Sequence, residues 1–167
     1  MKMDLLDTPL RGTWNLCGTD PSLTTDEALG IARRLAEAGL FYMTLEQQPL
    51  AHPGFERILA ELGGTGIQTS LVFSSMEQER RKLEPGLPVA GLWLDAAPFL
   101  RSGAVDRNAL EDELQLLRDT GYDPQLLLVP LRENIHLLVE LLELCQRLRV
   151  GSFKLPNVPI DGSFSSS

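Results

Sequence analysis

The sequence is poor in cysteine. Its 167 residues include two, Cys17 and Cys145, which lie far apart in the chain. They offer no closely spaced pair of thiols for a metal, and a disulfide between them would be unusual in a reducing cytoplasm. Cys145 falls in the apolar stripe of a predicted helix, so we expect it in the core.

The sequence also lacks long apolar runs and an excess of basic residues. No segment approaches the roughly 20 apolar residues that cross a bilayer, and the N-terminus has no signal-peptide pattern. The 15 lysines and arginines stand against 23 acidic residues, which gives a formal net charge of −8. This charge argues against electrostatic binding to nucleic acid or to an anionic membrane. We therefore predict a cytoplasmic protein with neither partner.

Short apolar β-like runs alternate with amphipathic helices along the chain. This alternation predicts an α/β fold with parallel strands joined by crossover helices, either as an open doubly wound sheet or as an incomplete barrel. The six strands are expected at 11–16, 40–45, 67–73, 89–94, 125–129 and 150–155. We predict one domain over residues 1–157 and a flexible serine-rich tail at 158–167, which marks a truncation point if a C-terminal domain is missing.

Helix signals separate the predicted strands. Thr24 and Glu27 form a capping box at the start of one helix, and Asp106 is the expected N-cap of another. The apolar stripe of the helix before the last strand is expected to comprise Ile135, Leu138, Leu142 and Cys145. Further helices are expected from Pro53 to about residue 62 and over 76–83, with a long loop at 96–105.

Several segments resemble the opening of a radical S-adenosylmethionine (SAM) domain. They are Leu-Thr-Thr-Asp-Glu-Ala-Leu at 23–29, Leu-Ala-Glu-Ala-Gly at 35–39 and the stretch 43–55. In that family a cysteine loop precedes a helix that begins like Leu-Thr-Thr-Glu-Glu-Ala. The next strand ends in Gly-Gly-Glu-Pro and runs on into Leu-x-His-Pro-x-Phe. Segments 92–95 and 134–155 are similar to the family's fourth strand, fifth helix and sixth strand. The resemblance implies an incomplete parallel (β/α)6 barrel of about six strands.

The sequence departs from this family at both parts of the family's active site. Members carry Cys-x-x-x-Cys-x-x-Cys after the first strand, and its three thiolates hold a 4Fe–4S cluster that binds SAM. This chain has only Cys17 there, and Glu46-Gln47-Gln48-Pro49 stands in place of Gly-Gly-Glu-Pro. Side chains at Gln47 and Gln48 would crowd the close backbone approach that glycine allows. We therefore expect a degenerate site with no cluster, SAM, metal or catalytic residue on this chain.

Ligands of parallel β/α folds collect at the carboxyl ends of the strands. The candidate rim and ligand-binding residues there are Asn15, Cys17, Glu46, Gln47, Gln48, Ser74, Asp95, Lys154 and Asn157, with Ser75, Arg132 and Glu133 on the same rim. Glu46 and Asp95 are a general acid–base pair if they face one cavity, and Lys154 is a candidate electrophile or Schiff-base amine. The alternative is that these groups solvate the rim and satisfy loop amides. Neither His52 nor His136 is expected to be catalytic.

Three functions follow from these observations. The leading hypothesis is a pseudoenzyme: a non-catalytic radical SAM-like barrel that binds a peptide substrate or an active radical SAM enzyme in a peptide-modifying system. Many relatives carry a cysteine-rich SPASM domain after the sixth strand, so the resemblance also implies auxiliary clusters in any further C-terminal part. The alternatives are a cluster-free β/α-barrel enzyme acting on a small molecule, and a radical SAM enzyme whose cluster ligands lie outside this chain.

Overall fold

The computed structural model describes residues 11–17, 23–75, 83, 85–101 and 103–156. It confirms a six-stranded sheet in which every pair of neighbouring strands is parallel. The strands are β1 (Arg11–Asn15), β2 (Tyr42–Glu46), β3 (Gln68–Phe73), β4 (Gly91–Asp95), β7 (Gln125–Leu127) and β8 (Ser152–Lys154). Their order in the sheet is β1-β2-β3-β4-β7-β8, the order in which they occur in the chain. Within the described residues β1 and β8 do not pair with each other, so the sheet is open at both edges.

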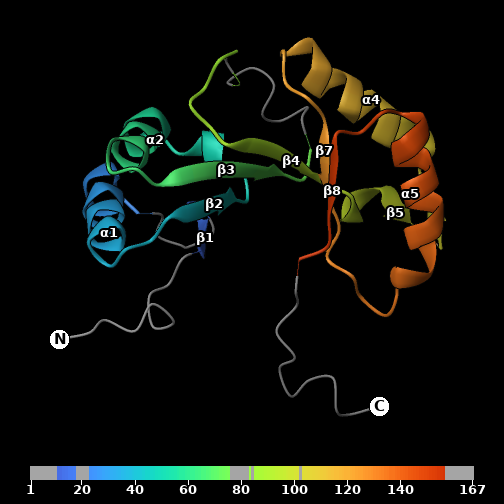
Figure 1. Ribbon diagram of the computed structural model, residues 1–167, viewed down its shortest axis with the longest axis horizontal. Coiled ribbons are helices and arrows are strands. Elements are labelled where there is room, and N and C mark those ends of the chain that lie inside the picture. The colour runs from blue at the N-terminus through green and yellow to red at the C-terminus, as the bar shows by residue number, and fades with distance from the viewer. Residues whose placement is uncertain (1–10, 18–22, 76–82, 84, 102, 157–167) are drawn as a thin grey trace.

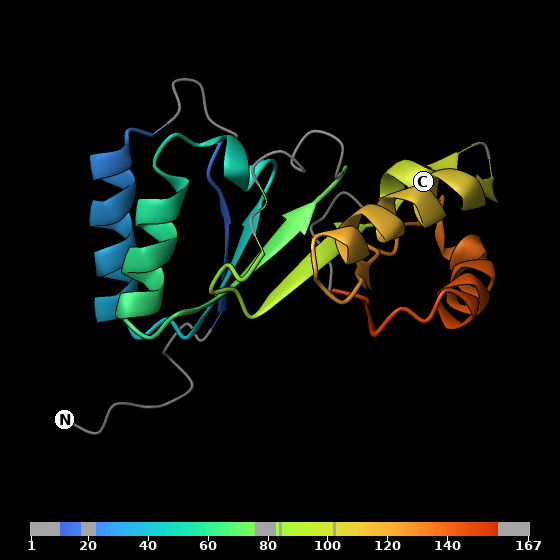
Figure 2. The same cartoon turned by 90° about the horizontal axis from the view of Figure 1, so that it is seen from above.

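Four α-helices follow β1, β2, β4 and β7 among the described residues. They are α1 (Thr25–Glu37), α2 (Phe55–Gly64), α4 (Arg107–Asp119) and α5 (Leu138–Arg147). Each helix carries the chain back to start the next parallel strand, which is the crossover that parallel pairing requires. Helices α1 and α2 lie beside the β1 end of the sheet, and α4 and α5 lie beside the β8 end (Figures 1 and 2).

Short elements complete the connections. Three 3-10 helices lie at η1 (Pro49–Ala51), η2 (Ala97–Phe99) and η3 (Ile135–Leu137). The long loop predicted at 96–105 contains η2 followed by an antiparallel pair, β5 (Leu100–Arg101) with β6 (Ala104–Val105). The predicted helix at 76–83 and the predicted tail at 158–167 lie outside the described residues, apart from Leu83, which is buried.

The two faces of the sheet differ in character. On the face that packs against the helices most strand residues are apolar and buried: Met43, Leu45, Leu71, Phe73, Leu92, Leu94 and Leu126, with Leu128 just after β7 and the buried Thr69 of β3 as a polar exception. The apolar residues share one core with helix residues such as Ala28, Ile58 and Leu110. Successive side chains of a strand point to opposite faces, so the intervening residues form the other face. That face carries most of the polar strand residues.

The helix starts follow the capping signals in the sequence. Thr24 is the N-cap of α1, where its backbone N–H and hydroxyl donate to the Glu27 carboxylate and its Oγ1 accepts from the Glu27 N–H. Asp106 caps α4 by accepting from the Ala109 N–H at 3.2 Å. Both predicted caps are confirmed. Helix α2 begins at Phe55 after Gly54, two residues later than Pro53 suggested.

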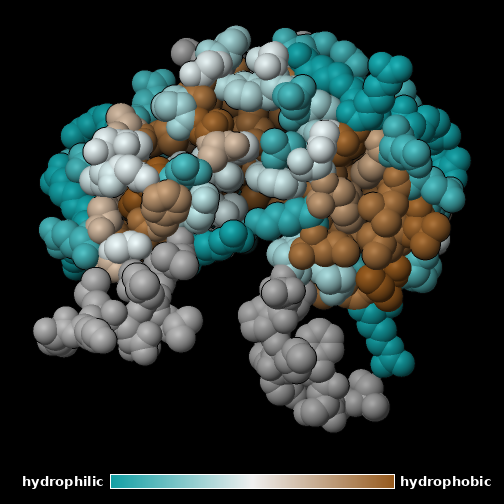
Figure 3. Space-filling model, viewed as in Figure 1, coloured by the Kyte–Doolittle hydropathy of each residue, from teal (hydrophilic) through white to brown (hydrophobic). Residues whose placement is uncertain are grey.

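The predicted stripe of α5 is confirmed at Cys145 and Leu138, which lie in or against the core, and is wrong at Ile135 and Leu142. The core-facing residues of the helix are Leu141, Leu144 and Cys145, preceded by Leu137 of η3, whereas Ile135 and Leu142 are 45% and 43% exposed. Val139 is also exposed, and an apolar area is seen over α5 in Figure 3. Cys145 is in the core as predicted, and burial raises the pKa of its thiol to about 11.

None of the described helices combines the length and apolarity needed to span a bilayer.

The contact between α1 and the start of α2 yields a stability prediction. A Cβ added at Gly54 would lie 2.8 Å from the Thr25 Cβ, whereas one added at Gly63, in α2, would meet nothing within 4 Å. Gly54→Ala should therefore lower the free energy of unfolding by about 1–3 kcal/mol through overpacking. Gly63→Ala should leave it unchanged or raise it by up to about 1 kcal/mol. Urea denaturation of both variants measures the difference, and equal effects would contradict this packing.

Candidate functional site

A cavity of about 370 Å³ lies on the polar face of the sheet, toward the carboxyl ends of the strands. Five of the predicted rim residues line it: Glu46, Gln47, Ser74, Asp95 and Lys154. They come from the ends of β2, β3, β4 and β8, which are distant in sequence but neighbours in a parallel sheet. The structure therefore brings together the central part of the predicted site.

The sheet register sets the spacing of these groups. Asp95, Leu127 and Lys154 are direct partners in one row across β4, β7 and β8. Val72 and Trp93 are partners across β3 and β4, two residues before Asp95 and on the same face of the sheet. All five residues line the cavity. The part of the floor on β3, β4 and β7 is thus apolar, Thr13 and Thr44 line the part on β1 and β2, and charged groups lie at the edge.

The two carboxyl groups share this cavity, and Asp95 affects the pKa of Glu46. Partial burial raises the pKa of Glu46, and the nearby Asp95 carboxylate raises it further, while Lys154 acts in the opposite direction. Burial also raises the pKa of Asp95, although its Oδ1 accepts a 3.0 Å hydrogen bond from the Ala97 N–H. Two acids whose charged forms are disfavoured in one cavity match the arrangement expected of a proton-transferring or cation-binding pair.

Trp93 provides an aromatic surface beside these acids. The Lys154 Nζ lies 5.4 Å from the centroid of the Trp93 ring, within the range of a cation–π interaction. Gly91 makes room for this indole, because an added Cβ there would lie 3.2 Å from the Trp93 Nε1 and 3.0 Å from the Gln125 Oε1. Sequence reasoning missed Trp93 as a site residue. The signal was its position two residues before Asp95, which puts both side chains on the same face of β4.

The remaining residues of the rim at β1 and β2 support the turn after β2. The Asn15 side chain donates to the Gln47 Oε1, and the Cys17 thiol contacts the Gln48 carbonyl oxygen at 3.4 Å. Gln47 and Gln48 both have left-handed backbone conformations, with φ of 56° and 58°. Such a conformation costs a residue with a Cβ roughly 1–2 kcal/mol. The turn keeps a shape that suits glycine while carrying two glutamine side chains.

Other predicted candidates are placed elsewhere. Arg132 and Glu133 are exposed on a turn and are not among the residues that line this cavity, and Asn157 lies outside the described residues. The Ser75 hydroxyl donates a hydrogen bond to the Glu113 Oε1, with 3.0 Å between the two oxygens. His52 is buried and structural: its Nε2 lies 2.9 Å from the Leu23 carbonyl oxygen and its Nδ1 accepts from the Gly54 N–H.

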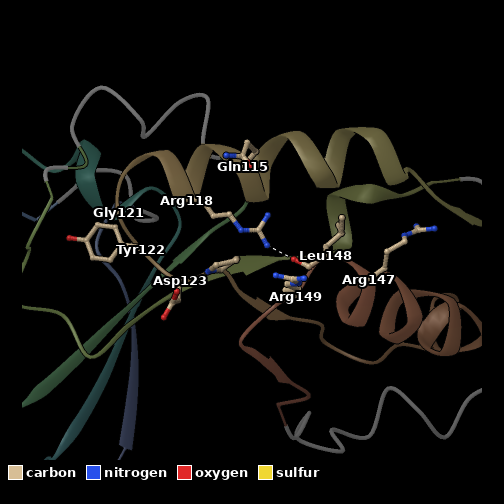
Figure 4. Close-up of a pocket in the computed structure, with 9 residues that line it drawn as sticks. Gln115, Arg118, Gly121, Tyr122, Asp123, Arg147, Leu148 and Arg149 are labelled. Atoms are coloured by element: carbon tan, nitrogen blue, oxygen red, sulfur yellow. Dashed lines mark hydrogen bonds between the residues drawn. The ribbon is translucent and has the colours of Figure 1, made fainter.

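A larger hollow of about 630 Å³ lies at the opposite end of the strands, before β7 and β8 (Figure 4). Three arginines line it, but Arg118 donates to the Leu148 carbonyl at the end of α5, and Arg147 extends away from the other two. The Arg118 hydrogen bond ties α4 to the end of α5. The smaller cavity at the carboxyl ends therefore remains the better candidate site. No group of three or more histidine, cysteine or acidic side chains suited to a metal occurs within the described segments.

The raised pKa of Glu46 gives a pH-dependent prediction. Because the folded state retains this proton to higher pH than the unfolded chain, ionisation of Glu46 lowers stability as pH rises above its ordinary pKa of 4.5. Glu46→Gln should therefore raise the melting temperature at pH 7.5 and have a smaller effect at pH 4. Glu111→Gln, exposed on α4, is the control for lost charge. A larger gain from Glu46→Gln at pH 4 than at pH 7.5 would contradict the prediction.

Comparisons with known proteins place the fold. No protein-family model matches the sequence, and neither does any curated protein. The structure is similar to Streptococcus suis SuiB bound to the precursor peptide SuiA, with a TM-score of 0.64 at 11% identity over 88% of this chain. SuiB alone and SuiB bound to S-adenosylmethionine give TM-scores of 0.62 and 0.57, at 11% and 12% identity, over 93% and 83% of this chain. The chain spans only 35–41% of the SuiB chains, and the likeness concerns the fold.

Proposed function

We propose that this chain is a non-catalytic, radical SAM-like half-barrel that binds a peptide across the polar face of its sheet, within a peptide-modifying system. The observation that carries the proposal is the cavity at the carboxyl ends of β2, β3, β4 and β8, where polar groups converge beside the apolar side chains of Val72, Trp93 and Leu127. Concave sites of this composition are where ligands bind in β/α folds.

The open edges of the sheet support a peptide as the ligand. Strands β1 and β8 form the two edges among the described strands, and an edge strand presents unpaired backbone N–H and C=O groups. An extended peptide can pair with such groups while its side chains enter neighbouring pockets. SuiB, whose fold is similar, has been solved with a precursor peptide and with S-adenosylmethionine. A peptide-modifying context is consistent with that likeness.

The cysteines support a role without radical chemistry. A 4Fe–4S cluster that activates SAM needs three thiolates, and the rim has one, Cys17, whose thiol faces the Gln48 carbonyl oxygen. The other cysteine of the sequence, Cys145, is buried against the helices in α5. These thiols do not fit the cluster.

The turn after β2 supports the same conclusion for SAM. Its backbone has the left-handed shape that a glycine pair would adopt, yet Gln47 extends its side chain along the cavity to Asn15. That amide occupies space which glycines would leave free for a ligand to approach the backbone.

A second candidate function rests on Glu46 and Asp95. Two carboxyl groups with raised pKa values in one cavity, with Lys154 beside Glu46, are suited to general acid–base catalysis on a small molecule. Glu46→Gln and Asp95→Asn distinguish the two functions, because an enzyme loses turnover with its ligand still bound, whereas a binding protein loses only affinity.

Peptide binding is tested by selection from a random-sequence peptide display library against the folded chain. Selected peptides should lose roughly tenfold or more in affinity when Trp93→Ala removes the aromatic surface, a loss typical of a buried aromatic contact. Arg132→Ala, on an exposed turn outside the cavity, should bind them unchanged. Calorimetric titration gives the dissociation constants. Failure to select any peptide, or equal affinity for Trp93→Ala, would contradict peptide binding at this cavity.

The non-catalytic part of the proposal is tested separately by anaerobic reconstitution with iron and sulfide. The chain should retain much less than one cluster per molecule, measured by iron and sulfide content and by visible absorbance. Cys17→Ser should give the same values as the unmodified chain. A stoichiometric 4Fe–4S cluster that disappears in Cys17→Ser would contradict this part.

A further inference from the structure

The cavity combines an aromatic surface with two acids. Trp93 lines it from β4, Glu46 from the end of β2 and Asp95 from the end of β4. A cation is attracted to the face of an indole and to carboxylates by the same electrostatic interaction, and partial exclusion of water strengthens both attractions. The three groups together therefore make a receptor for a positively charged side chain.

A cation of the chain itself already occupies this receptor. Lys154 is in the same sheet row as Asp95 but two strands away, with Leu127 between them. Its Nζ nevertheless lies over the Trp93 ring at 5.4 Å from the centroid, and its charge acts on Glu46. The long side chain thus reaches back across β7 to the cavity.

Nothing in the described structure fixes Lys154 there permanently. The residue is exposed, it belongs to the edge strand β8, and its Nζ makes no hydrogen bond or close ion pair with another described residue. A flexible ammonium group held mainly by a ring face and by longer-range attraction to carboxylates can be displaced by a stronger cation.

We infer that this cavity is the subsite for a cationic side chain of the bound peptide, and that Lys154 occupies it until the peptide displaces it. The inference rests on the proposed peptide-binding function. An arginine side chain is the favoured ligand. Its planar guanidinium stacks on an indole and donates several hydrogen bonds in a fixed fork, which suits a site with an aromatic face and two carboxyl groups.

Competition gives the inference its sharpest test. The probes are the peptides acetyl-Gly-Gly-Arg-Gly-Gly-amide and its citrulline analogue, which keeps the shape of arginine without its charge. Binding is measured by calorimetry and by tryptophan fluorescence in a Trp14→Phe background, which leaves Trp93 as the remaining tryptophan of the sequence. The arginine peptide should bind more tightly than the citrulline peptide by roughly five- to thirtyfold, the range of a partly desolvated cation–π and carboxylate contact.

Lys154→Met keeps an unbranched apolar side chain but removes the competing charge. It should bind the arginine peptide more tightly than the wild type, with no matching gain for the citrulline peptide. Glu46→Gln should weaken arginine binding. Arg132→Met makes the same change in net charge outside the cavity and should leave both affinities unchanged. Lys154→Gln is a second variant, in case methionine alters the fold, which circular dichroism checks.

The outcomes separate this inference from the function on which it rests. Equal binding of the arginine and citrulline peptides, or weaker arginine binding by both Lys154 variants, overturns the cationic subsite while peptide binding stands. Absence of binding by both probes overturns the cationic subsite too, and the library selection then decides independently whether the chain binds peptides at all.

Discussion

The structure depends on helices covering one face of the sheet, which leaves the opposite face, with most of the polar strand residues, to form the site. Strand β4 shows the alternation of side chains on which this arrangement depends. In β4, Leu92 and Leu94 are buried in the core, whereas Trp93 and Asp95 line the cavity. A one-residue slip in register would exchange these sets, burying a carboxyl group and exposing leucines. The packing of the core therefore also fixes which side chains form the site.

The sequence predicted the fold well where local chemistry and the tertiary structure agree. The strand runs and the caps at Thr24 and Asp106 depend on short-range patterns, and they appear at the expected places. Helix α5 shows the limit of this reasoning. Its leucines occupy two overlapping helical stripes, so periodicity alone does not identify the face that meets the sheet. Packing selects the stripe with Leu141 and Leu144, and Leu142 stays partly exposed.

The site was predictable in its composition but not in its contacts. Because all strands run in one direction, the polar residues at their carboxyl ends had to meet at one edge, and Glu46, Asp95 and Lys154 do line one cavity. The contact of Lys154 with Trp93 has no sequence signal. It depends on how far a long side chain reaches across β7 and on the space that Gly91 leaves for the indole. Such contacts between distant segments require the folded structure.

The turn after β2 connects the strain in this fold to its proposed role. Two successive residues with a Cβ in left-handed conformations cost roughly 1–2 kcal/mol each, so neighbouring contacts must hold them. Those contacts come from β1 and the residues just after it, through Asn15 to the Gln47 side chain and through Cys17 to the Gln48 carbonyl. Gln47 is thereby directed along the cavity that Lys154 enters from the opposite edge of the sheet. A left-handed turn that serves only to reverse the chain would be more stable with glycine. With glutamine, the same turn delivers an amide to the cavity, where it can hydrogen-bond the backbone of the peptide that we propose as the ligand.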